Sequence, residues 1–167
     1  MIVLLVGGIA GVAAGLAAEP GFWYCKYTYP DGRVYIGNWK GSMRHGWGKM
    51  IYTNGDVYVG NWKEDLAHGE GTMTYAKGKG GEYIGNWKDG MRHGWGQMRY
   101  KNGKVYKGEW ENGKRHGQGT MTYADGSVYD GNWVKDKKDT KIRRLMSVCV
   151  RVSGAAVSGA VAAAGMI

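Results

Sequence analysis

The sequence predicts a mainly β protein: an elongated antiparallel β-meander of hairpin repeats that forms a single twisted sheet, flanked by an N-terminal and a C-terminal apolar helix. Three observations lead to this prediction. A short pattern of aromatic residues and glycines recurs at a nearly constant spacing, each copy follows the two-residue period of a β-strand, and both ends of the 167-residue chain are apolar.

The recurring pattern starts with a tyrosine, continues through Gly-x-Trp and His-Gly-x-Gly, and ends with a second tyrosine. Its leading tyrosines, which are 23, 25, 23 and 23 residues apart, are Tyr35, Tyr58, Tyr83, Tyr106 and Tyr129. A fixed spacing in this range is typical of a repeat array, in which each unit packs on its neighbours. It argues against a globular enzyme domain.

Each copy of the pattern is expected to form two short strands. Tyr35, Gly37 and Trp39 alternate and so share one face of an extended strand, and the residues from Gly46 to Tyr52 repeat the alternation. Asn-Gly and Asp-Gly pairs, which tolerate the positive φ of tight primed turns, separate the strands. These pairs lie at 54–55, 89–90, 102–103, 112–113 and 125–126.

Glycine stands between the tyrosine and the tryptophan of every strand that opens a unit. Without a Cβ, a residue such as Gly37 leaves room for an aromatic ring to lie across the backbone. We expect equivalent rings to stack into two ladders, one of tryptophans and one of tyrosines, that serve as the core of the sheet. The composition fits this expectation, with 8 Trp and 12 Tyr but 1 Phe.

The pattern Tyr-x-Gly-x-Trp-x5-His-Gly-x-Gly-x3-Tyr resembles the MORN repeat (membrane occupation and recognition nexus). The resemblance covers a repeat sheet over 20–134, with a half unit at 22–34, full units at 35–57, 58–82, 83–105 and 106–128, and a partial unit at 129–134. It implies contact with proteins, self-association, or binding of phosphoinositides. The second unit departs from the pattern by Asp65 and by two extra residues within 77–81, where the turn should bulge.

Residues 1–19 are expected to form an apolar helix that anchors the protein in a membrane. The segment also resembles a signal-peptide core, although it lacks the basic residues that precede one. Gly7, Gly11 and Gly15 stand four apart, which in an apolar helix makes a smooth stripe for close packing of another helix.

Residues 145–167 are rich in small apolar residues and are expected to form a second helix. Gly154 and Ser158 stand four apart, and Gly159 lies beside them on a second such stripe. A second membrane span, a helix buried in protein or at an interface, and a loose tail remain alternatives. Helices of this kind favour packing among other helices of a membrane complex, such as a photosynthetic or respiratory supercomplex.

The formal net charge of +9 is unevenly spread. Residues 135–151 hold seven basic residues against two acidic ones, while the chain before them has 16 against 12, so a basic linker is predicted at 135–144. Its cations, which are candidates for contact with anionic lipid, are Lys135, Lys137, Lys138, Lys141, Arg143 and Arg144. A solubilising linker is the alternative. By the positive-inside rule this linker predicts that the repeat sheet lies on the cytosolic, matrix or stromal face of its membrane.

No catalytic, cofactor-binding or metal-binding site is predicted, and we expect no enzymatic activity and no small-molecule substrate. The histidines His45, His68, His93 and His116 occupy one position in successive repeats, about 10 Å apart, whereas zinc ligands converge on one centre at about 2.1 Å. Cys25 and Cys149 are expected to be unpaired thiols. Nucleic acid is not expected as a partner, because aromatics in strict register are the core of the sheet rather than an exposed stacking platform.

Trp47 and Trp95 lie between the paired glycines of their units, where the other units have Glu70 and Gln118. The fold therefore does not require tryptophan there, and both are candidates for contact with a partner. A lid over the aromatic core is the alternative. The leading hypothesis is a non-catalytic scaffold or accessory subunit of a membrane protein complex, with the sheet as a docking surface for other subunits. Binding of anionic phospholipid, and regulation of a partner enzyme, are the other hypotheses.

Overall fold

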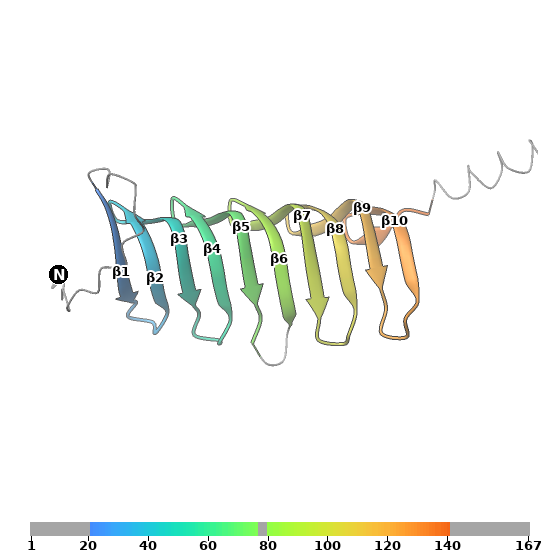
Figure 1. Cartoon of the computed structure of the whole chain (residues 1–167), viewed down its shortest axis with the longest axis horizontal. Coiled ribbons are helices and arrows are strands. Elements are labelled where there is room, and N and C mark those ends of the chain that lie inside the picture. The colour runs from blue at the N-terminus through green and yellow to red at the C-terminus, as the bar shows by residue number, and fades with distance from the viewer. Residues whose placement is uncertain (1–20, 77–79, 141–167) are drawn as a thin grey trace, which may run out of the picture.

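The computed structural model describes residues 21–76 and 80–140, which form one antiparallel sheet of eleven strands in chain order (Figure 1). The strands are β1 (Phe22–Thr28), β2 (Val34–Lys40), β3 (Met43–Ile51), β4 (Val57–Lys63), β5 (Leu66–Thr74), β6 (Gly81–Lys88), β7 (Met91–Tyr100), β8 (Val105–Glu111), β9 (Lys114–Thr122), β10 (Val128–Val134) and β11 (Lys137–Lys138). The predicted single-sheet meander is confirmed. Both predicted flanking helices, at 1–19 and 145–167, lie outside the described residues, as does most of the turn at 77–81.

Every full unit contributes one hairpin whose two strands are out of step by a bulge. In the first unit Gly37 pairs with Gly48 and Trp39 pairs with Arg44, so residues 45–47 of β3 stand opposite Asn38 alone. The bulge needs a left-handed residue, and Gly46 supplies it with φ of +68°. The His-Gly-x-Gly motif therefore encodes the bulge of each hairpin.

The turns are of two kinds. Within a unit they are primed, as predicted: Asn112 and Gly113 have φ of +49° and +78°. Between units the prediction of a tight primed turn is wrong. Gly55 N–H donates to the Tyr52 carbonyl and Asn54 does not have a positive φ, so residues 53–55 form a longer loop in which only the glycine is left-handed.

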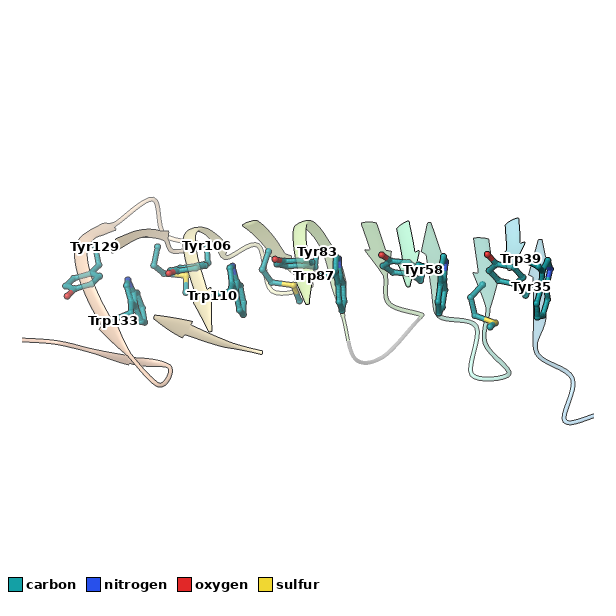
Figure 2. Packing of buried hydrophobic residues seen from close by; sticks show 13 residues of the cluster. Tyr35, Trp39, Tyr58, Tyr83, Trp87, Tyr106, Trp110, Tyr129 and Trp133 are labelled. Carbon is teal, nitrogen blue, oxygen red and sulfur yellow. The ribbon is translucent and has the colours of Figure 1, made fainter. Parts of the chain in front are cut away.

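The core lies on one face of the sheet, which we call the ring face. It is a single row in which tyrosine and tryptophan rings alternate (Figure 2). The Tyr35 ring lies 5.0 Å from Trp39 of its own unit and 5.5 Å from Trp62 of the next, with interplanar angles of 88° and 85°. The two separate ladders predicted from the sequence are thus wrong. Perpendicular rings place a positive edge against a negative face, which stacked copies of one ring would not do.

The predicted role of the glycines is confirmed. A Cβ added at Gly48 would overlap the hydroxyl of Tyr35, and one at Gly37 would overlap the backbone of Gly48. The tyrosine ring therefore lies directly on the bare backbone of the opposite strand. Tyr35 is fully buried by this contact although no second layer covers the sheet within residues 21–76 and 80–140.

The sheet extends past residue 134, where the sequence predicted a linker. Lys135 and Asp136 form a turn with positive φ, and β11 then pairs with β10 through Trp133 and Lys138. The partial fifth unit is therefore a short hairpin over 128–138.

Candidate interaction surface

The ring face carries a column of cations that pack on the rings. The guanidinium of Arg44 lies 4.3 Å from the centre of the Trp62 ring, close enough for a cation–π interaction. Its Nε donates to the Asp65 carboxylate at 2.8 Å and its Nη2 to the Asp65 carbonyl at 2.7 Å. Each such arginine therefore joins the tryptophan and the turn of the following unit.

We call these positions the arginine column, because each faces the tryptophan of its own hairpin across the strand pair. Its members are Arg44, Ala67, Arg92, Arg115 and Lys138. Arg92 and Arg115 lie 4.3 and 4.4 Å from Trp110 and Trp133. The column was not predicted, although a signal existed: in the full units its residue directly precedes the histidine of the repeat.

The opposite side of the sheet, which we call the open face, has no covering layer among the described residues. Trp47 and Trp95 are on it, with 53% and 59% of their surfaces exposed. Each directly precedes a glycine, Gly48 or Gly96, that lies against a tyrosine of the ring face, so its own side chain points the other way. Neither covers the rings, and the lid interpretation fails. Whether they contact a partner stays a prediction.

A third aromatic residue belongs with these two tryptophans. Tyr24 pairs with Asn38 as Trp47 pairs with Asn61, and 67% of its surface is exposed. We call the resulting line across the open face the interglycine row, made of Tyr24, Trp47, Glu70, Trp95 and Gln118. Tyr24 was not predicted, because β1 lacks the glycines of the repeat, although the residue lies 23 positions before Trp47.

The β1 edge of the sheet is also aromatic. Phe22, Trp23 and Tyr27 are exposed there, and Phe22 packs edge-on against His45 at 5.8 Å. The indole Nε1 of Trp39 is buried and finds no hydrogen-bond acceptor in the described part of the chain. By contrast, the Trp62 indole donates to the Gly48 carbonyl of the preceding unit.

The histidines line the sheet one unit apart, as predicted. His68 Nδ1 lies 3.6 Å from the Asp89 carboxylate, and His116 Nδ1 lies 3.4 Å from that of Glu111. Over residues 21–76 and 80–140 no three side chains of the types that bind metals come together.

The predicted lipid contacts are only partly described. Lys135 and Lys137 are exposed at the last turn, whereas the Lys138 ammonium packs over the ring of Tyr129 at 4.5 Å. The other three cations of the predicted linker and all six residues of the predicted helix-packing stripes lie outside the described residues. No helix capable of crossing a membrane occurs within 21–76 or 80–140.

Burial controls the ionisation of the tyrosine hydroxyls on the ring face. It raises the pKa of Tyr35, Tyr83 and Tyr106 far above the usual value for a phenol, and the neighbouring arginine opposes the rise in each case. Burial likewise raises the pKa of the Cys25 thiol, which is free. The three tyrosine hydroxyls therefore stay protonated, act as hydrogen-bond donors and offer no general base.

Comparison with known proteins agrees with the periodicity. The protein-family model described as the MORN repeat matches residues 35–57, 58–80, 83–105, 106–128 and 129–139. These segments cover more than half of the chain. Each begins at the leading tyrosine of a unit, within the first strand of that unit. No curated protein matches the chain.

Proposed function

The chain belongs to the MORN-repeat family, and from that premise we propose that it is a non-catalytic scaffold or accessory subunit of a membrane protein complex. MORN repeats generally take part in interactions with proteins or membrane lipids. In this proposal the sheet is a docking surface for another subunit, and the expected helices at 1–19 and 145–167 hold it at the membrane.

The interglycine row is the observation that carries this proposal. Tyr24, Trp47 and Trp95 expose large rings on a face where other units place Glu70 or Gln118 in the same register. Exposed aromatic side chains that the fold does not need are typical anchors of protein interfaces. The open face, which spans many strands and is uncovered in the described part of the chain, also gives a partner a long surface on which to lie.

A double variant of the full-length chain tests the proposal. Trp47→Glu with Trp95→Gln gives both units residues that the neighbouring units already carry at this position, so the sheet should stay folded. We expect the wild-type protein, extracted in mild detergent and run on a native gel, to migrate in a large assembly. The double variant should migrate mainly as a smaller species.

The matched control exchanges polar residues in the same row, Glu70→Gln with Gln118→Glu, and should leave the assembly intact. Circular dichroism of both proteins checks that the sheet is unchanged. A wild-type chain that runs as a free monomer, or a double variant that assembles normally, would contradict docking through this row.

Binding of anionic phospholipid is the second candidate function, favoured by the exposed lysines Lys135 and Lys137 at the last turn. Each charge near an anionic surface contributes about 1 kcal/mol. The variant Lys135→Asn with Lys137→Met copies residues found at these turn positions in other units, Asn112 and Met91. Weaker sedimentation of the full chain with phosphoinositide vesicles, in a salt-dependent manner, would favour this function. Unchanged sedimentation would exclude these two lysines from it.

A further inference from the structure

We propose that the second unit holds a binding site for an arginine side chain of the partner protein, formed by Trp87, Tyr58 and the carbonyl of Gly90 beside Ala67. This inference rests on the proposed docking function. The site lies on the ring face, opposite the interglycine row, so it describes a second contact made by the docked subunit. We call these four residues the Ala67 site.

The third unit shows what such a site looks like when it is filled. The guanidinium of Arg92 lies 4.3 Å from the centre of the Trp110 ring and 5.7 Å from that of Tyr83. Its Nη2 donates to the Gly113 carbonyl at 2.7 Å. A planar cation thus stacks on an aromatic pair and hydrogen-bonds to the adjoining turn.

The second unit has the same surroundings without the arginine. The rings of Tyr58 and Trp87 lie 5.2 Å apart at 84°, compared with 5.3 Å at 85° for Tyr83 and Trp110. The turns also match, because Asp89 and Gly90 have φ of +50° and +79°, within about a degree of those of Asn112 and Gly113.

The backbone places residue 67 where residue 92 stands in its own unit. Gly90 N–H donates to the Ala67 carbonyl at 2.9 Å, as Gly113 N–H donates to the Arg92 carbonyl at 2.9 Å. Ala67 has no side-chain donor to give to the Gly90 carbonyl. Of the five column positions in the described sheet, this is the one without a cation.

The absence of an arginine at position 67 changes the exposure of the neighbouring tryptophan. Trp87 keeps 7% of its surface exposed, against 4% for Trp62 and 3% for Trp110. Burial raises the pKa of the Tyr58 hydroxyl, and no arginine opposes that rise, unlike at the other fully buried tyrosines. Tyr58 is fully buried, so the Trp87 ring is the part of this aromatic pair that reaches the surface.

The rim of the Ala67 site suits a side chain with a positive end and an apolar stem. The carboxylate of Asp89 is exposed at the same turn, where it attracts a cation. Leu66 is also exposed there, and its Cδ2 lies beside Gly90. Arginine fits better than lysine because its planar group stacks on a ring while still donating to a carbonyl, and the chain itself uses arginine in three units.

Nuclear magnetic resonance of the full chain tests the site directly, with the blocked amino acid N-acetyl-arginine methylamide as the probe. We expect the probe to shift the indole Nε1–H resonance of Trp87 more than that of any other tryptophan. The citrulline analogue, which has the same shape without the charge, should shift it much less. If no tryptophan responds to the arginine probe, the inference is wrong.

Two substitutions that follow the pattern of the repeat sharpen this test. Ala67→Arg should fill the site from within and abolish the response of Trp87. Arg92→Ala should create a second site, so that the indole resonance of Trp110 begins to respond; the native second unit shows that alanine is compatible with the fold there. A Trp87 response that persists in Ala67→Arg would overturn the inference.

The native-gel assay separates this inference from the docking function. Ala67→Arg should raise the protein concentration at which half of the chains are assembled by about tenfold, since it removes one desolvated charged contact. An assembly that is lost in the interglycine-row variant but unaffected by Ala67→Arg refutes the arginine contact and leaves docking intact. An assembly weakened by Ala67→Arg and by an alanine replacing the partner's arginine, identified by crosslinking at position 67, supports it.

Discussion

The hydroxyl of Tyr35 donates to the carbonyl of Asn38, 2.9 Å away, at the point where the strand pair bulges. The same bond recurs in every unit, from Tyr58, Tyr83, Tyr106 and Tyr129 to the carbonyls of Asn61, Asn86, Glu109 and Asn132. In the last unit the Asn132 carbonyl also accepts from the Asp139 N–H at 2.8 Å, so the tyrosine adds a second hydrogen bond to that backbone acceptor. Each leading tyrosine therefore has two roles, as a core ring and as a hydrogen-bond donor to the backbone of its own strand, which in the four full units is the strand opposite the bulge.

Removing one such hydroxyl should destabilise the sheet without opening it. In Tyr58→Phe the Asn61 carbonyl loses the hydrogen bond from the tyrosine hydroxyl while the ring remains, and we expect a loss of about 1 kcal/mol in the free energy of unfolding. Denaturant titration followed by tryptophan fluorescence measures it. Tyr24→Phe, at an exposed position, is the control and should change the stability by less than about 0.5 kcal/mol.

A methyl group at the ring-face glycines should be far more harmful. In Gly71→Ala the new Cβ would overlap the Tyr58 hydroxyl, so the ring must leave the backbone, and we expect a loss of about 3 kcal/mol or more. Thermal unfolding provides the measurement. As a control, Gly41→Asn places at a φ of +59°, in open space, the residue that the fourth unit has at its own turn, and should be tolerated. Equal effects of both substitutions would show that the ring does not need the bare backbone.

The arginine column should contribute to stability through its planar groups. Arg92→Ala removes a cation–π contact and a charged hydrogen bond to the Gly113 carbonyl, with an expected loss of about 1–3 kcal/mol. Arg92→Lys keeps the charge without the planar group and should recover less than half of that loss. If lysine restored the full stability in denaturant titrations, charge alone would explain the column.

The sheet should lose stability in base. Burial raises the pKa of Tyr35, Tyr58, Tyr83 and Tyr106 above the value of about 10 expected in the unfolded chain. Below pH 10 both states keep these protons and the stability is at its full value. Above pH 10 only the unfolded state releases them, so the free energy of unfolding falls by up to about 1.4 kcal/mol per pH unit for each tyrosine.

Denaturant titrations at pH 8, 9, 10 and 11 measure this dependence. Tyr58→Phe supplies the internal control, because a chain with one fewer buried phenol should show a shallower fall above pH 10. An unfolding midpoint that stays constant between pH 9 and pH 11 would contradict the burial of these hydroxyls.

Much of the fold followed from the sequence because the period of the repeat and the alternation within it are local signals. The hairpins, the primed turns within units and the glycine gaps were predicted correctly. The pairing of rings was not, because the Tyr35–Trp62 contact crosses between units and depends on how far a bulge offsets neighbouring strands. The loops between units were misjudged because Asn-Gly suits both a two-residue turn and the end of a longer loop.

The candidate surface was less accessible to prediction. Trp47 and Trp95 stood out because they differ from Glu70 and Gln118, but assigning them to a face required the bulge register. The arginine column is periodic in the sequence, yet nothing local shows that Arg44 covers a ring 18 residues further along the chain. Ala67 gained meaning only when its neighbours in the column were seen to be filled.

Each repeat tryptophan after Trp39 depends on contacts from the preceding unit. Trp62, for example, packs against the ring of Tyr35 and donates a hydrogen bond to the carbonyl of Gly48. Units can therefore be added to the sheet in one direction, and nothing within a unit limits how many follow it. A whole cassette could be spliced in or removed in evolution or by an engineer, with every internal junction rebuilt as before. The number of units would then set the distance between the two ends of the sheet, and with it the spacing of any partners bound there.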